Sequence, residues 1–243
     1  MLEVQYATRI LEIIEDVKVS QTESIVQAAK LIAETIKNDG LLHLFGCGHS
    51  HILVEEVFYR AGGIVPVNPM FESSAMLHEG AVKSSKVEKM QGYAEHILNN
   101  YEVREGEVII LFSTSGINSL PIEMAIEAKK RGLKIIAFTS SSYLGQASRH
   151  PSGKRLSDLA DIVIDNKQPY GDALVEVPGT EIKMSSGSTV VGSFLLNMVM
   201  ARTVEELQQI GVEPPIFKSG NIEGGAEYNQ RYIQKYKSRI KHL

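Results

Sequence analysis

Two stretches near the amino terminus repeat apolar residues at the spacing of one helix face. The first places them at Tyr6, Ile10, Ile13, Ile14 and Val17, and the second at Ile25, Ala28, Ala29, Ile32, Ala33 and Ile36. Intervals of three and four residues predict two helices, the second followed closely by Gly40. Such a pair either covers a face of the fold as a helical hairpin or forms a subunit interface, and the periodicity alone does not decide between the two.

From residue 41 onward, short apolar runs alternate with helical patterns. The predicted strands cover 41–45, 64–67, 107–112, 134–139 and 161–164. The predicted helices cover about 50–61, 86–99, 118–131 and 186–210. Apolar strands separated by helices predict an α/β fold, a three-layer αβα sandwich with a five-stranded, mainly parallel sheet. Ligands bind such sheets at the carboxyl ends of the strands, so functional residues are expected directly after each strand.

Composition and charge narrow the class of protein. The chain has 243 residues, 43% of them hydrophobic, and no visible repeat or linker, so 1–243 is expected to be one domain. Within it, N-terminal helices occupy 1–40, the α/β core 41–210 and a C-terminal tail 211–243. A net charge of −4 disfavours a nucleic-acid partner. No stretch has the length of a membrane span or the pattern of a signal peptide, and the single Cys47 fits the reducing cytoplasm.

The strand at 107–112 runs into STSGINS, a turn dense in hydroxyl and amide side chains. Free backbone amides at a helix start attract phosphate oxygens, and the hydroxyls of Ser113, Thr114 and Ser115 can donate to the same oxygens. Gly116 lets the backbone approach a ligand closely, and the Asn118 amide is a further donor. Helix capping is the alternative explanation, but it accounts for only one or two of these residues. The turn therefore predicts an anion site.

The strand at 41–45 ends in a second turn of this kind, GCGHSH, which contains Gly48 and Ser50. Two such turns on parallel strands are expected to face one phosphate from two sides. Neither contains lysine or arginine, so binding would rely on neutral donors and helix ends, which suits a small phosphorylated metabolite. A dinucleotide site is disfavoured, because its fingerprint needs glycine in place of His51 and an acidic residue in place of Asn68.

The segment EVIILFSTSGINSLPIEMAIEAKKRGLKIIAFTSS resembles the signature of the sugar isomerase (SIS) domain family, which binds phosphosugars. In that family a strand ends in Ser-x-Ser-Gly-x-Ser/Thr, and these hydroxyls hold the phosphate. The resemblance carries this role to Ser113 and Ser115, places Asn118 at the last hydroxyl position, and matches Ser50 to the serine of a Gly-x-Gly-x-Ser turn. It covers about residues 20–210 and implies a flavodoxin-like variant of the nucleotide-binding fold.

A further match, KMSSGSTVVGSFLLNMVM at 183–200, is similar to the final helix of the bacterial N-acetylmuramic acid 6-phosphate etherases. It places Ser185, Ser186 and Ser188 at a helix start, where Ser186 is expected to face the sugar. Capping and close packing are the alternative explanation. Heptose-phosphate isomerases carry a catalytic histidine on this last helix, and this chain has none there. The choice between isomerase and lyase stays open.

Proton transfer on a sugar phosphate requires a carboxylate or an imidazole near the substrate. The catalytic candidates are His78 and Glu79, adjacent in the loop after the second strand, and Glu55, on the helix after Ser50. The wider set of candidates adds His51, Glu56, Glu72, Glu223 and Glu227. A solvated polar loop is the alternative for residues 78 and 79. No metal-ligand spacing such as H-x-x-x-H is present, so neither a metal nor another cofactor is expected.

The C-terminal stretch KSGNIEGGAEYNQRY precedes a helical pattern that needs a packing surface. We expect this tail to dock on a neighbouring subunit and to close its site, and a disordered tail is the alternative. Together the patterns predict a cytoplasmic homodimer or homotetramer that binds a small-molecule sugar phosphate and isomerises or eliminates it. A non-catalytic phosphosugar sensor is the alternative function.

Overall fold

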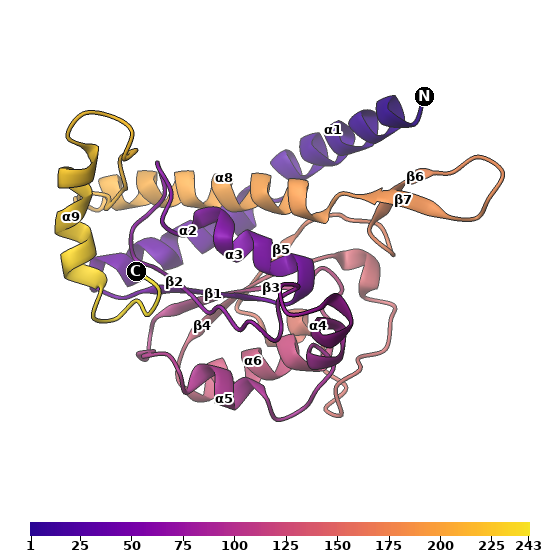
Figure 1. Ribbon diagram of the computed structural model, residues 1–243, viewed down its shortest axis with the longest axis horizontal. Helices are drawn as coiled ribbons and strands as arrows, with labels where there is room; N and C mark the ends of the chain where they lie inside the picture. The colour runs from indigo at the N-terminus through magenta and orange to yellow at the C-terminus, as the bar shows by residue number, and fades with distance from the viewer.

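Five parallel strands form the centre of the molecule, and the computed structural model describes residues 1–243 (Figure 1). The strands are β1 (Leu42–Gly46), β2 (Val67–Pro69), β3 (Val108–Phe112), β4 (Lys134–Thr139) and β5 (Ile162–Asp165). Their order in the sheet is β2-β1-β3-β4-β5, and every neighbouring pair is parallel. This order is that of flavodoxin-like, doubly wound sheets. The predicted α/β class with a five-stranded parallel sheet is confirmed.

Helices bury both faces of the sheet. On one face lie α2 (Thr22–Lys37), α3 (Ile52–Val57) and α8 (Ser188–Gln209), and on the other α4 (Ala81–Val87), α5 (Ala94–Leu98), α6 (Ser119–Lys130) and α7 (Leu156–Leu159). Successive strand residues point to opposite faces, so Leu42 and Leu44 of β1 join the first core and Phe45 joins the second. The three layers of the predicted sandwich are present.

The two N-terminal helices are present, but they do not fold back as a hairpin. α1 (Leu2–Ser20) runs on into α2 with a bend at Gln21, whose φ of −101° and ψ of 5° stay near helical values. The Gln21 amide donates to the Val17 carbonyl, and the Ile25 amide donates to the Gln21 carbonyl, so helical hydrogen bonding crosses the bend. α1 therefore projects from the core beside a hairpin of β6 (Ala173–Glu176) and β7 (Lys183–Ser186) (Figure 1).

Three predicted elements differ in extent. The second strand was expected at 64–67, whereas β2 begins at Val67, because Ile64 forms an antiparallel bridge with Ile216 instead. The single helix expected at 86–99 is interrupted at Gly92 (φ 78°), where the amide donates to Glu123, and becomes α4 and α5. The last core helix starts at Ser188 rather than 186, because the preceding residues form β7. Two short 3₁₀ turns, η1 (Gly48–His51) and η2 (Ser141–Tyr143), follow β1 and β4.

The C-terminal segment packs on its own chain, which corrects the expected docking on a neighbour. After α9 (Gly225–Tyr236), the side chains of Tyr236 and Ile240 join a small core with Leu41, Val65 and Phe217. Arg239 forms an ion pair with Glu107 at 2.8 Å, and Glu107 also contacts His43 at 2.8 Å. The segment lies at the left of Figure 1, beside the amino ends of the strands. No helix of the chain combines the length and apolar character needed to cross a membrane.

Candidate functional site

The turns after β1 and β3 begin side by side at the carboxyl edge of the sheet. Gly46 of β1 pairs with Phe112 of β3, so the next residues, Cys47 and Ser113, start neighbouring turns about 5 Å apart. Gly46 is required by this geometry, since a side chain there would meet the Ser50 backbone at 2.7 Å. The chain therefore folds back tightly after β1, and Ser50 is half-buried in η1.

The turn after β3 leaves two backbone amides without an acceptor. Ser113 Oγ accepts from the Gly116 amide at 3.2 Å, while the amides of Ser115 and Ile117 find no acceptor within the chain. Gly116 has a φ of 62°, and a Cβ there would lie 2.8 Å from Thr139 Oγ1, so glycine is needed for both conformation and space. Unpaired amides beside serine hydroxyls form an arrangement that can hold an anion.

Two side chains of this turn are already engaged. Thr114 Oγ1 accepts from Asn166 at 3.2 Å and can still donate its own proton. Asn118 donates to Glu88 at 2.6 Å and accepts from Arg149 at 2.7 Å, which uses both ends of its amide. A ligand in this turn would therefore meet Ser113, Ser115 and the backbone amides rather than the Asn118 side chain.

Glu88, just after α4, binds one turn and acts electrostatically on the other. It accepts the hydrogen bond from Asn118, and it lies close enough to Cys47 to act on its thiol. Burial raises the pKa of Cys47 well above its ordinary value, and the Glu88 carboxylate raises it further. Cys47 is 5% exposed and stays a thiol, so it acts as a small buried residue.

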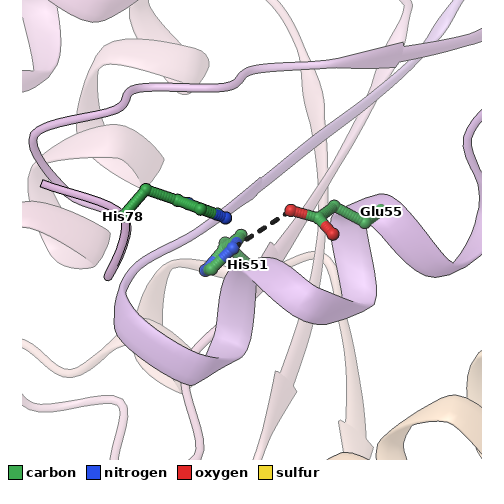
Figure 2. Close-up of side chains that lie close together, drawn as sticks. All are labelled: His51, Glu55 and His78. Carbon is green, nitrogen blue, oxygen red and sulfur yellow. Dashed lines mark ion pairs between the residues drawn. The ribbon is translucent and has the colours of Figure 1, made fainter.

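His51, Glu55 and His78 come together beside the first turn (Figure 2). His51 ends η1 and Glu55 follows one helical turn later in α3, so their side chains share a face and lie 3.1 Å apart, from Nε2 to Oε1. His78 comes from the loop after β2, and its ring lies edge-on to that of His51, with centroids 5.2 Å apart. The Gly48 amide donates to Ala75 at 2.8 Å, which ties this loop to the first turn.

The contacts of His51 define its hydrogen-bonding roles. Nδ1 lies against the Gly48 carbonyl, an acceptor only, so Nδ1 carries a hydrogen. Nε2 then faces the Glu55 carboxylate, with Oε1 3.1 Å away. The pair lies at a solvent-exposed edge, because the Glu55 side chain is 48% exposed.

The remaining sequence candidates lie outside this cluster. Glu79 is exposed and forms an ion pair with Lys83, and the hydrogen bond from Lys83 lowers the pKa of its carboxyl. Glu72 accepts from the Tyr93 hydroxyl at 2.8 Å. Ser186 lies in β7, where its carbonyl accepts from Tyr6 at 3.2 Å, and Ser188 at the start of α8 donates to Asp172 at 2.6 Å.

Three contacts of the site were not predicted. One of them, between His51 and Glu55, had a signal in the sequence, an i, i+4 spacing on a predicted helix. Glu88 and Arg149 lie 30 and 31 residues from Asn118 along the chain, so no local pattern indicated their bonds to it. Only the folded chain brings them together.

The residues that build both turns fall within a match to a known family. The family model of the SIS domain matches residues 5–140, more than half of the chain. The chain belongs to the SIS domain family. Two relatives of this SIS protein cover nearly its full length. It is 49% identical over 242 residues to a UPF0309 protein of Caldanaerobacter subterraneus, and the match covers 98% of each chain. It is 47% identical over 237 residues to a UPF0309 protein of Geobacillus kaustophilus, and that match covers 97% of this chain and 94% of the relative.

Solved structures share the fold of this SIS domain. The phosphoheptose isomerase GmhA of Neisseria gonorrhoeae aligns with a TM-score of 0.52 at 18% identity, covering 85% of this chain and 98% of that one. A phosphoheptose isomerase of Francisella tularensis aligns with a TM-score of 0.51 at 14% identity, covering 84% and 95%. At these identities the likeness concerns the fold, and the predicted SIS domain architecture is confirmed.

Proposed function

We propose that this SIS domain binds a sugar phosphate at the carboxyl edge of β1 and β3 and isomerises or eliminates it by proton transfer. The observation that carries the proposal is the meeting of two features at one edge. Unpaired amides and serine hydroxyls lie in adjacent turns, and the His51–Glu55–His78 cluster starts one residue after Ser50. The fold shared with two proteins named phosphoheptose isomerases supports the same substrate class.

Phosphate binding would use neutral donors. The phosphate oxygens would be surrounded by groups from both turns. The first turn would supply Ser50, and the second would supply Ser113, Ser115 and the backbone amide of Ile117. Helix α6 begins directly after this turn and adds the positive end of its dipole. Because no lysine or arginine belongs to either turn, binding is expected to be reversible at ordinary metabolite concentrations.

The cluster would supply proton transfer. Isomerisation removes a proton from a carbon beside a carbonyl and returns one to the neighbouring carbon, and elimination expels a leaving group instead. The His51–Glu55 pair would donate a proton to a substrate oxygen, while the exposed His78 would accept one from carbon. Glu79, the third sequence candidate, is held by Lys83, so its contribution would require that ion pair to open.

Ligand-induced thermal stabilisation tests the binding proposal. A panel of sugar phosphates should raise the melting temperature where the same sugars without phosphate do not, since a ligand of the folded state stabilises it by mass action. Ser113→Ala and Ser115→Ala should each weaken binding by about 1–3 kcal/mol, the cost of losing a hydrogen bond to a charged oxygen. Ser238→Ala, at an exposed residue of the C-terminal segment, is the control. Unchanged affinity in both site variants would refute the site.

Solvent-deuterium incorporation tests catalysis separately. A bound sugar phosphate should acquire deuterium at carbon in D₂O, and His78→Gln or Glu55→Gln should slow this by about 10²–10⁴-fold. Glu56→Gln, on the same helix but bonded to Asn197 and Arg60, should leave the rate unchanged, and so should Glu79→Gln. Binding without exchange for every bound sugar phosphate would instead assign the protein as a phosphosugar sensor.

We further propose that the protein acts in the cytoplasm as a homodimer or homotetramer. Its lone cysteine is buried and free, and α1 exposes Val4, Leu11 and Val19, each more than half exposed. A projecting helix with exposed apolar residues on a hydrophobic-cored domain is typical of a subunit interface.

A further inference from the structure

We propose that His51, Glu55 and His78 together bind one divalent transition-metal ion of the zinc class. Each side chain offers one ligand atom, and these atoms lie within 4.8 Å of one another (Figure 2). Two imidazoles and a carboxylate form a ligand set that such ions prefer. The inference concerns binding of the ion itself, which does not depend on the proposed activity toward sugar phosphates.

The surroundings of His51 suit a metal ligand. Its Nδ1–H donates to the Gly48 carbonyl, which fixes the tautomer and directs the Nε2 lone pair toward Glu55 and His78. Metal-binding histidines generally donate their other ring N–H to a carbonyl or carboxylate in this way. The ring is buried and held by the turn, so His51 is a preorganised ligand.

The spacing needs only a small adjustment. Ligand atoms around a tetrahedral zinc ion lie about 3.3 Å apart, from metal–ligand distances of about 2.0–2.1 Å. His51 Nε2 and Glu55 Oε1 already stand at 3.1 Å. His78 is exposed at the end of the loop after β2, and a movement of about 1–1.5 Å brings its ring nitrogen to the same spacing. Loops of this kind adjust more readily than the helix that carries the other two ligands.

Three protein ligands on a solvent-exposed edge leave the fourth position open. A structural zinc site is closed by four protein ligands, whereas a three-ligand site takes water or a substrate oxygen. The ion would engage the ligand atoms of His51, Glu55 and His78 together. An ion held there would block proton transfer by these side chains, a consequence that rests on the proposed function.

Calorimetric titration of the metal-free full-length protein with Zn²⁺ tests the site. We expect one equivalent to bind, and His78→Gln and Glu55→Gln each to weaken its affinity at least tenfold. His49→Gln and Glu79→Gln are matched controls, because both side chains are exposed and close in sequence but outside the cluster, and they should retain wild-type affinity. With Co²⁺, the wild type should show the visible absorption of a four-coordinate site, and the His78→Gln variant should not. Because His78 is exposed, this variant should fold normally.

Absence of a stoichiometric Zn²⁺ site in wild type would overturn the proposal. It would equally fail if both ligand variants kept wild-type affinity, or if His49→Gln lost as much affinity as His78→Gln. These titrations contain no sugar phosphate, and the thermal-shift series for the proposed function is run with a chelator. Failure of one proposal can therefore be told apart from failure of the other.

Discussion

Glu107 lies just before β3 with 3% of its surface exposed, and four groups surround its carboxylate. His43 Nε2 contacts it at 2.8 Å, the amides of Leu41 and Arg104 donate at 2.9 and 2.8 Å, and Arg239 pairs with it at 2.8 Å. Burial alone would raise the pKa of Glu107, but the hydrogen bonds and charge of His43 and the two amides outweigh it and lower the pKa to about 2. The carboxylate thus ties β1, β3 and the C-terminal segment together.

This network predicts a specific acid sensitivity. Because the folded-state pKa of Glu107 lies below its ordinary value of 4.5, its contribution to the free energy of unfolding is complete above about pH 4.5 and is lost as the pH falls toward 2. Glu107→Gln should destabilise the protein by about 3–5 kcal/mol at pH 7, with the difference from wild type shrinking across that window. Urea unfolding between pH 7 and 2.5 measures it, with Glu105→Gln, exposed nearby, as control. A difference that does not change with pH would contradict this account.

At the scale of elements, the C-terminal segment is part of the fold. Ile240 is 1% exposed in the small core beside β1, whereas Ile222, earlier in the same segment, is 55% exposed. The two isoleucines therefore form a matched pair for measuring what the docking of this segment contributes.

We predict that Ile240→Ala lowers the free energy of unfolding by about 2–5 kcal/mol, because it removes buried methyl groups and leaves a cavity. Ile222→Ala should change it by less than about 0.5 kcal/mol, as is usual at exposed positions. Chemical denaturation of both variants measures the difference. Equal effects of the two substitutions would show that the segment does not pack as the structure has it.

Elements were predictable where one physical signal dominated. β1, β3 and β4 are fully buried or nearly so and β5 is half-buried, and their apolar runs gave their positions to within a residue or two. β2 was displaced, because Ile64, in the apolar run, pairs with Ile216, 152 residues later in the chain, which no local pattern reveals. The β6–β7 hairpin was missed since the four residues of β7 are exposed and carry no apolar alternation.

The candidate site was predictable as two turns and not as a set of contacts. The serine-rich turns could be placed at one edge because parallel strands end together. The partners of Asn118 and the position of His78 beside His51 depend on loops folding across the edge, and their long separation in sequence hid them. Glu79, next to His78, was expected beside it but turns to Lys83 instead, since neighbouring loop residues need not share a direction.

At the scale of the whole molecule, we predict self-association through α1. Light scattering on the purified chain should give two or four times its mass of 26.8 kDa. Leu11→Asp, which places a charge on the exposed face of α1, should reduce the measured mass, whereas Val82→Asp, at a similarly exposed residue of α4, should not. A wild-type mass of one chain at micromolar concentration would contradict the prediction.

Because of the bend between α1 and α2, a small change of angle there moves the far end of α1 by a large distance. Its angle is set at Gln21, whose side chain accepts a hydrogen bond from the Asp165 amide at 2.9 Å, at the end of β5. The nineteen residues of α1 extend about 28 Å beyond Gln21. A rotation of ten degrees at Gln21 would therefore sweep the amino terminus through about 5 Å. The contact of Gln21 with β5, together with Ile10 and Val17 in the main core, therefore fixes how far the amino terminus reaches.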